Sequence, residues 1–203
     1  LVGSEMCIRD SHIIAFKDVI VSILAGYMMI PMVLFINNVS MLFSKNYLEA
    51  ASQTLLTYPF VVQIILMAVI PALVEEFIFR GLFYGTYRKC GVLKGALMSG
   101  LVFGLFHLNI NQFCYAFVIG VVFAFLVEAT GSIWSSVLAH FAINTYSITI
   151  IQLLKITGTY DTMQEAAGET VVQSSSISML LTLAMLLGAV SYTHLTLPTI
   201  RLV

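Results

Sequence analysis

The chain has 203 residues, of which 60% are apolar and 9% are charged, with a formal net charge of -1 and a mean hydropathy of +0.99. Soluble domains are about 45–50% apolar and about 25% charged, so this composition excludes an intrinsically disordered chain and a basic nucleic-acid-binding protein. It also argues against a water-soluble enzyme. We therefore expect an all-α polytopic membrane protein that lies in a lipid bilayer and has no nucleic-acid partner.

The two ends of the chain differ from the rest. Residues 1–11 begin without Met and lack the layout of a signal peptide. Residues 190–203 interrupt the apolar pattern with Tyr192, His194 and Pro198. Both segments resemble translated adapter sequence, so we expect them to be non-native and residues 12–189 to form one membrane-embedded domain without its native termini.

Apolar stretches with polar flanks predict about six membrane spans, because a spanning helix needs about 20 apolar residues. In chain order they are 13–36, 58–87, 92–108, 113–129, 132–154 and a stretch that starts near 177. No internal repeat is visible.

Basic residues predict the orientation of these spans. Arg88, Lys89 and Lys94 lie between the second and third stretches, whereas the 155–176 linker is net acidic. Cytoplasmic loops carry the excess of Lys and Arg, so 88–94 is expected inside. Alternation then puts 37–57, 109–112 and 155–176 outside and 129–131 inside.

Three charged residues lie inside the second apolar stretch, namely Glu75, Glu76 and Arg80. Each charge costs about 2.5–3.5 kcal/mol at mid-bilayer, so such residues face a protein interior or an aqueous cavity and are candidates for function. Glu76 and Arg80 are four residues apart in the order that favours an ion pair. Alternatively, the three residues could form one buried ion-pair cluster that only stabilises helix packing. Two acids and one base, however, leave one acid without a partner in such a cluster.

Two histidines lie in later stretches. Phe103 precedes His107 by four residues, and Asn144 follows His140 by four residues, so each pair shares a helix face. Glu75, His107 and His140 each lie about 18–20 Å along a helix from a charged boundary at the predicted cytoplasmic side, which predicts a shared level in the membrane. Gly100 and Gly104 would permit close helix packing, and the polar side chains could alternatively bridge helices as hydrogen-bond donors.

An acid, two imidazoles and an amide suit water activation. A carboxylate can take a proton from water that a histidine orients, and a second histidine and an amide can stabilise an oxyanion. Zinc is the alternative, with Glu75, His107 and His140 as ligands and water in the open position. The H-E-x-x-H signature is absent, and no cofactor is preferred.

The ordered motifs then carry a family resemblance. Glu75-Glu76-Phe77-Ile78-Phe79-Arg80, Phe103-Gly104-Leu105-Phe106-His107 and His140-Phe141-Ala142-Ile143-Asn144 resemble the three motifs of the CPBP intramembrane proteases. This is the CAAX-protease and bacteriocin-processing (Abi) family, which includes the type II CAAX prenyl endopeptidase. The resemblance covers about 70–150.

The resemblance implies an intramembrane endopeptidase in a bacterial plasma membrane, with a cavity open to the cytosol and a membrane protein or peptide as substrate. By motif position, Glu75 would activate water, His107 would orient it, and His140 and Asn144 would bind the oxyanion. Glu76 and Arg80 would hold the first motif, with Phe103 in support. Family members commonly have about eight spans, and the oligomeric state, the substrate and the choice between metal and glutamate chemistry stay open.

Two other functions compete with proteolysis. Buried Glu and His residues also serve proton relays in transporters, although the inverted repeats of many transporters are absent. A catalytically silent immunity or scaffold protein is the third hypothesis, and it would tolerate the loss of Glu75 and His107.

Overall fold

The computed structural model describes residues 14–44 and 54–160, which form helices joined by short turns and contain no strand. The predicted all-α class is confirmed for this part of the chain. The helices are α2 (Phe16–Ser40), α4 (Phe60–Ile64), α5 (Ile70–Glu76), α6 (Gly85–Tyr87), α7 (Val92–Phe106), α8 (Ile110–Thr130) and α9 (Ile133–Ile156).

The segment from α4 to α6 is one continuous helix, Phe60–Cys90, with two π-helical stretches at Ile65–Val69 and Phe77–Tyr84. Pro71 lies at the start of α5 and has no N–H for the preceding turn, which explains why the regular hydrogen-bond ladder changes there. A π-helical stretch follows Glu76 directly, and such stretches recur at functional sites.

Four helices of the described residues are long and apolar enough to cross a membrane: Phe16–Ser40, Phe60–Cys90, Ile110–Thr130 and Ile133–Ile156. Five of the six predicted spans fall in this part of the chain, and four of them match these helices, so the predicted count is too high by one here. The stretch predicted at 92–108 forms α7, whose 15 residues reach about 22 Å against a hydrocarbon core of about 30 Å. The predicted span from 177 and both predicted non-native ends lie outside the described residues.

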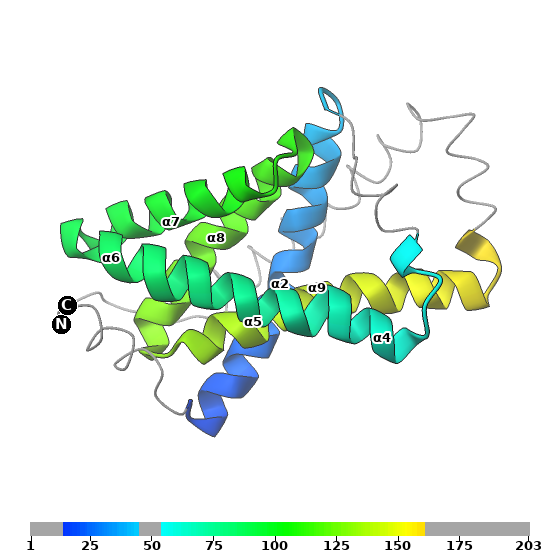
Figure 1. Ribbon diagram of the computed structural model, residues 1–203, viewed down its shortest axis with the longest axis horizontal. Helices are drawn as coiled ribbons and strands as arrows, with labels where there is room; N and C mark the ends of the chain where they lie inside the picture. Colours follow the sequence, from blue (N-terminus) through cyan, green and yellow to red (C-terminus); the bar gives the residue numbers. More distant parts are fainter. Residues whose placement is uncertain (1–13, 45–53, 161–203) are drawn as a thin grey trace, which may run out of the picture.

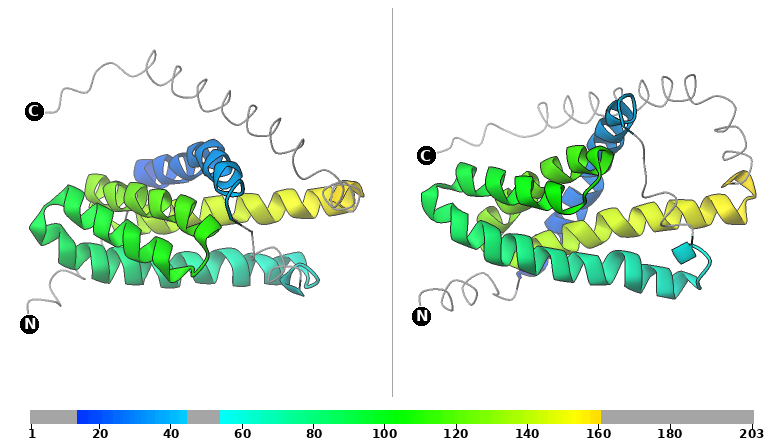
Figure 2. Two further views of the ribbon diagram at one scale, coloured as in Figure 1. Left: turned by 90° about the horizontal axis from the view of Figure 1, so that it is seen from above. Right: turned by 45° about the horizontal axis from the view of Figure 1, so that its top comes forward.

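The helices pack in layers. In Figures 1 and 2, α2 and the Phe60–Cys90 helix lie on opposite sides of α8 and α9. Two close crossings rest on glycine: a Cβ on Gly26 would lie 2.5 Å from the Ala139 carbonyl oxygen in α9, and one on Gly120 would lie 2.7 Å from the Gly100 Cα in α7. The predicted close packing at Gly100 is thus confirmed.

Polar contacts mark two opposite ends of the α7–α8 hairpin. At one end Arg88 pairs with Glu128 at 3.0 Å, and the Tyr84 hydroxyl donates to the same carboxylate at 2.7 Å. At the other end the Asn111 amide donates to the Ser40 hydroxyl at 2.6 Å. The outward surface between the ends is rich in exposed Leu, Ile, Val and Phe, as expected of a lipid-facing surface.

Candidate active site

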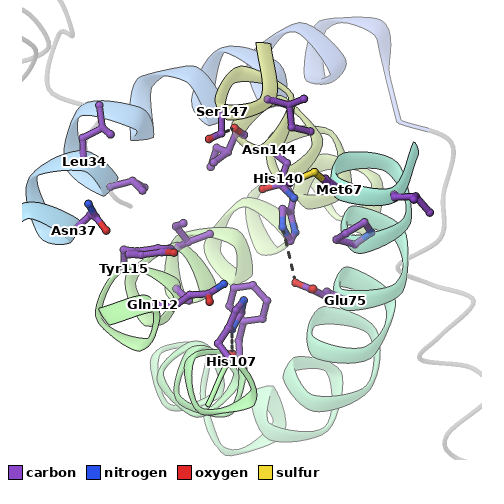
Figure 3. A pocket seen from close by; sticks show the side chains of 18 of the residues that line it. Leu34, Asn37, Met67, Glu75, His107, Gln112, Tyr115, His140, Asn144 and Ser147 are labelled. Carbon is purple, nitrogen blue, oxygen red and sulfur yellow. Dashed lines mark hydrogen bonds and ion pairs between the residues drawn. The ribbon is translucent and has the colours of Figure 1, made fainter. Parts of the chain in front are cut away.

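A cavity of about 500 Å³ lies between α2, α5, α7, α8 and α9. All four predicted catalytic residues, Glu75, His107, His140 and Asn144, line this cavity (Figure 3). The structure therefore brings together side chains from three helices that the sequence motifs place up to 69 positions apart. Apolar side chains form most of the remaining wall, so a polar site is enclosed by surfaces that fit apolar groups.

Glu75 and His140 face each other across the cavity wall. The distance from Glu75 Oε2 to His140 Nε2 is 3.9 Å, with the Glu75 side chain 21% exposed and the His140 side chain 9% exposed. This distance is longer than a hydrogen bond, yet it lets one small group contact both atoms. Glu75 is therefore the carboxylate of the motif that reaches the cavity.

Glu76 points away from the cavity and is fully buried. Its Oε1 accepts hydrogen bonds from Arg80 Nη1 at 2.9 Å and from His140 Nδ1 at 2.8 Å. The predicted Glu76–Arg80 ion pair is present, with both side chains 0% exposed. Because His140 Nδ1 donates to Glu76, Nε2 is the ring atom directed at Glu75, so the buried pair orients the imidazole.

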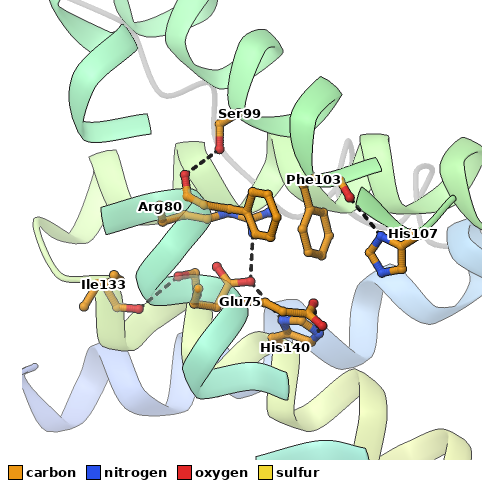
Figure 4. A network of polar contacts seen from close by, with 10 residues as sticks. Glu75, Arg80, Ser99, Phe103, His107, Ile133 and His140 are labelled. Atoms are coloured by element: carbon orange, nitrogen blue, oxygen red, sulfur yellow. Dashed lines mark hydrogen bonds and ion pairs between the residues drawn. The ribbon is translucent and has the colours of Figure 1, made fainter. Parts of the chain in front are cut away.

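Aromatic rings enclose the buried cation. The Arg80 guanidinium carbon lies 4.4 Å from the centre of the Phe103 ring and 5.2 Å from that of Phe123. Phe103 also meets the rings of His107 and His140 edge to face, at 5.0 and 6.0 Å between centroids. Phe103 thus connects the buried charge to both histidines, and Figure 4 shows its ring between Arg80 and His107.

His107 lies at the end of α7, where the helix stops and backbone carbonyls lack helical partners. Its Nδ1 is 2.8 Å from the Phe103 carbonyl oxygen, which can only accept, so Nδ1 carries the proton. In the neutral ring Nε2 is then an acceptor. The cavity wall thus contains a second imidazole, whose Nε2 can accept a hydrogen bond.

Sequence reasoning missed four polar residues of the cavity wall, namely Asn37, Gln112, Tyr115 and Ser147. In Figure 3, Gln112 and Tyr115 extend from α8 beside His107. Their spacing of three residues places them on one helix face, which was the available signal. Asn37 comes from α2 and carried no signal, because Gln112, a polar residue of the same cavity wall, lies 75 positions away in the chain.

The zinc alternative can be tested on the donor set. Within residues 14–44 and 54–160, no group of three His, Cys, Asp or Glu side chains is arranged to hold a metal ion. The predicted ligands Glu75, His107 and His140 line one cavity, but their side chains are not arranged to bind one metal ion. We therefore derive no step through a metal.

The cavity lies nearer one end of the helix bundle than the other. Its lining comes from the ends of α2, α7 and α8 that lie away from Arg88 and Glu128, including Asn37 and Gln112. These residues belong to segments predicted outside. The lining therefore places the cavity nearer the end of the bundle that lies opposite Arg88.

The segment that contains the three motifs is similar to a known protein family. Residues 57–146 match the family model of the type II CAAX prenyl endopeptidase, Rce1-like. This segment is therefore similar to the CPBP proteases that the motifs resemble. The matched range contains every residue of the site except Asn37, Ser147 and a few apolar wall residues.

A curated relative also matches part of the chain. The chain is 33% identical over 91 residues to a Bacillus subtilis (strain 168) protein named "Putative membrane peptidase YdiL". The alignment covers 44% of this chain and 37% of that relative, so the chain spans little more than a third of its length. No solved structure matches the chain significantly.

Proposed function

We propose that the protein is an intramembrane endopeptidase that hydrolyses a peptide bond of a membrane-associated protein or peptide. The observation that carries this proposal is one cavity holding Glu75, His107, His140 and Asn144 from three motifs of a protease family. A carboxylate, two imidazoles and an amide around an apolar-walled space form a set that fits acyl transfer to water.

Glu75 is proposed as the general base. A water in contact with Glu75 and His140 loses a proton to the Glu75 carboxylate as its oxygen attacks the scissile carbonyl carbon. The Nε2 of His107 accepts the second hydrogen bond of that water, because its Nδ1 proton is held by the Phe103 carbonyl. Glu75 then returns the proton to the leaving amine, so the step needs no other acid.

His140 and Asn144 are proposed to stabilise the oxyanion. Asn144 lies one helical turn after His140 on the same cavity wall, so both can donate to one oxygen. When His140 carries two protons, Nδ1 donates to Glu76 and Nε2 donates to the oxyanion.

The substrate is proposed to be a bilayer-resident peptide rather than a soluble protein. Leu34, Leu66, Met67, Ile119 and Ile143 form much of the wall, and these side chains fit an apolar residue next to the scissile bond. The described part of the chain offers no feature that requires a prenyl group.

We infer that the Arg88 end faces the cytoplasm of a bacterial plasma membrane, because Arg88, Lys89 and Lys94 gather there. The cavity then lies nearer the outer face, contrary to the orientation that the family resemblance suggested. Cys90 is exposed at this end and gives the test, with Cys7 and Cys114 changed to Ala. We expect membrane-impermeant maleimide to label Cys90 only after cells are permeabilised, and labelling in intact cells would reverse the orientation.

The experiment for the activity uses the full chain in liposomes. The probes are a transmembrane reporter peptide with a fluorophore and quencher, and a farnesylated peptide of the C-terminal Cys-aliphatic-aliphatic-Met type. We expect cleavage of the reporter by the parent and by Glu128→Gln, and its loss in Glu75→Gln. Proton flux without cleavage of either probe would favour the transporter, and the absence of both would favour the silent scaffold.

A further inference from the structure

The turn between α7 and α8, residues 107–109, and the helix ends that flank it have an unusual surface for a loop. Leu105, Phe106, Leu108 and Ile110 are 56%, 62%, 95% and 67% exposed, respectively. Leu108 has a φ of 51°, in the left-handed region that turns in water fill with Gly or Asn. An almost fully exposed leucine in this conformation is unfavourable in water on both counts.

Helix length fixes how deep this turn can lie. Arg88 and Lys89 precede α7 and Lys94 lies in its first turn, and basic side chains of this kind anchor a helix end at a membrane interface. From Lys94, the 13 residues to His107 span about 20 Å, and any tilt of α7 shortens the depth reached. The hydrocarbon core is about 30 Å thick, so the shorter arm, α7, leaves the turn about 10 Å short of the opposite boundary. Helix α8, about 27 Å from Glu128 to Ile110, must tilt to end at the same depth.

Irregular backbone is excluded from hydrocarbon unless its polar groups have partners, and here many do. The His107 and Leu108 N–H groups donate to Gly104 and Leu105 carbonyls at 3.2 and 3.1 Å. The Asn109 side chain accepts from the Asn111 N–H at 3.0 Å and caps α8. The Phe103 carbonyl, left free by the end of α7, accepts from His107 Nδ1.

We infer that the α7–α8 turn is immersed in the acyl chains of the bilayer and contacts lipid through Leu105, Phe106, Leu108 and Ile110. The turn forms the lipid side of the protein next to His107. This inference does not depend on the proposed proteolysis, since it rests on exposure, helix length and backbone hydrogen bonding.

Tryptophan fluorescence tests the inference. Trp134 is the single tryptophan of the sequence, so Trp134→Phe gives a background for Leu108→Trp, with Tyr87→Trp as the interfacial reference. The full chain is placed in liposomes whose acyl chains carry bromine at graded depths. We expect Leu108→Trp to be quenched several-fold more by deep bromines than by shallow ones, and Tyr87→Trp to show the reverse order.

A second tryptophan variant checks that the substitution at Leu108 does not itself change the depth of the turn. Phe106→Trp reports from the same turn and should give the same depth order as Leu108→Trp. Strongest quenching of both by shallow bromines, or by aqueous acrylamide to the level of free tryptophan, would overturn the inference. Loss of proteolysis with unchanged depth would count only against the proposed function.

Discussion

Removing the charge of Glu76 should destabilise the protein more than any other single polar change at the site. Glu76→Gln keeps the size of the side chain but leaves the Arg80 cation, 0% exposed, without its ion-pair partner. Removal of one partner of a buried pair costs about 3–5 kcal/mol, because the remaining charge stays desolvated. Contacts of Arg80 with Phe103 and Phe123 offset about 1–2 kcal/mol of this at most.

The matched control is Glu128→Gln, which makes the same chemical change in a solvated pair. Its partner is Arg88, and the two side chains are 30% and 21% exposed, so the expected cost is about 0–1 kcal/mol. The free energy of unfolding of both variants is measured by equilibrium titration in mixed micelles. The reasoning predicts a difference of at least about 2 kcal/mol between them.

The double variant separates pairing from packing. Arg80→Met alone leaves Glu76 as a buried unpaired carboxylate, whereas Glu76→Gln with Arg80→Met removes both charges. We expect the double variant to cost less than the sum of the single changes by about 2 kcal/mol or more. Additive costs, or a Glu76→Gln cost equal to that of Glu128→Gln, would refute the view that this pair is dry and coupled.

Four further predictions follow from the geometry. Phe103→Ala should lower the free energy of unfolding by about 3–5 kcal/mol, because Phe103 is 2% exposed. Phe106 is 62% exposed, so Phe106→Ala should cost less than half as much in the same titration. Gly120→Ala should destabilise by about 1–3 kcal/mol, because the new Cβ meets α7 backbone at 2.7 Å, while Gly81→Ala meets only the Ile133 side chain at 3.4 Å and should be tolerated. Tyr115→Phe should lower kcat/KM for the reporter about fivefold, the worth of one hydrogen bond of about 1 kcal/mol, without changing stability. Chelators should leave reporter cleavage intact, and full inactivation restored by zinc would instead support the metal-dependent alternative.

The sequence predicted most of the site because charges are scarce in this chain. With 9% charged residues, Glu75, Glu76 and Arg80 in one apolar stretch stand out, and the four-residue spacings assign helix faces. Equal distances from the charged boundaries also predicted a common level for Glu75, His107 and His140. The cavity that all three line agrees with that prediction.

Other features depend on contacts that sequence patterns do not carry. The hydrogen bond from His140 to Glu76 depends on how α9 packs on α5. The length of α7 was overestimated, because apolar character continues past Phe106 into the turn. Asn37 and Gln112 joined the site only through tertiary packing of α2 against the start of α8.

The central claim is that Glu75 activates the attacking water, and the most direct measurement is single-turnover cleavage of the transmembrane reporter by Glu75→Gln in liposomes. General-base catalysis contributes about 10²–10⁴-fold, so the rate constant should fall at least a hundredfold while the free energy of unfolding changes little, since Glu75 is partly exposed to the cavity. Glu128→Gln should retain the parent rate. A Glu75→Gln rate within a few fold of the parent would contradict the account.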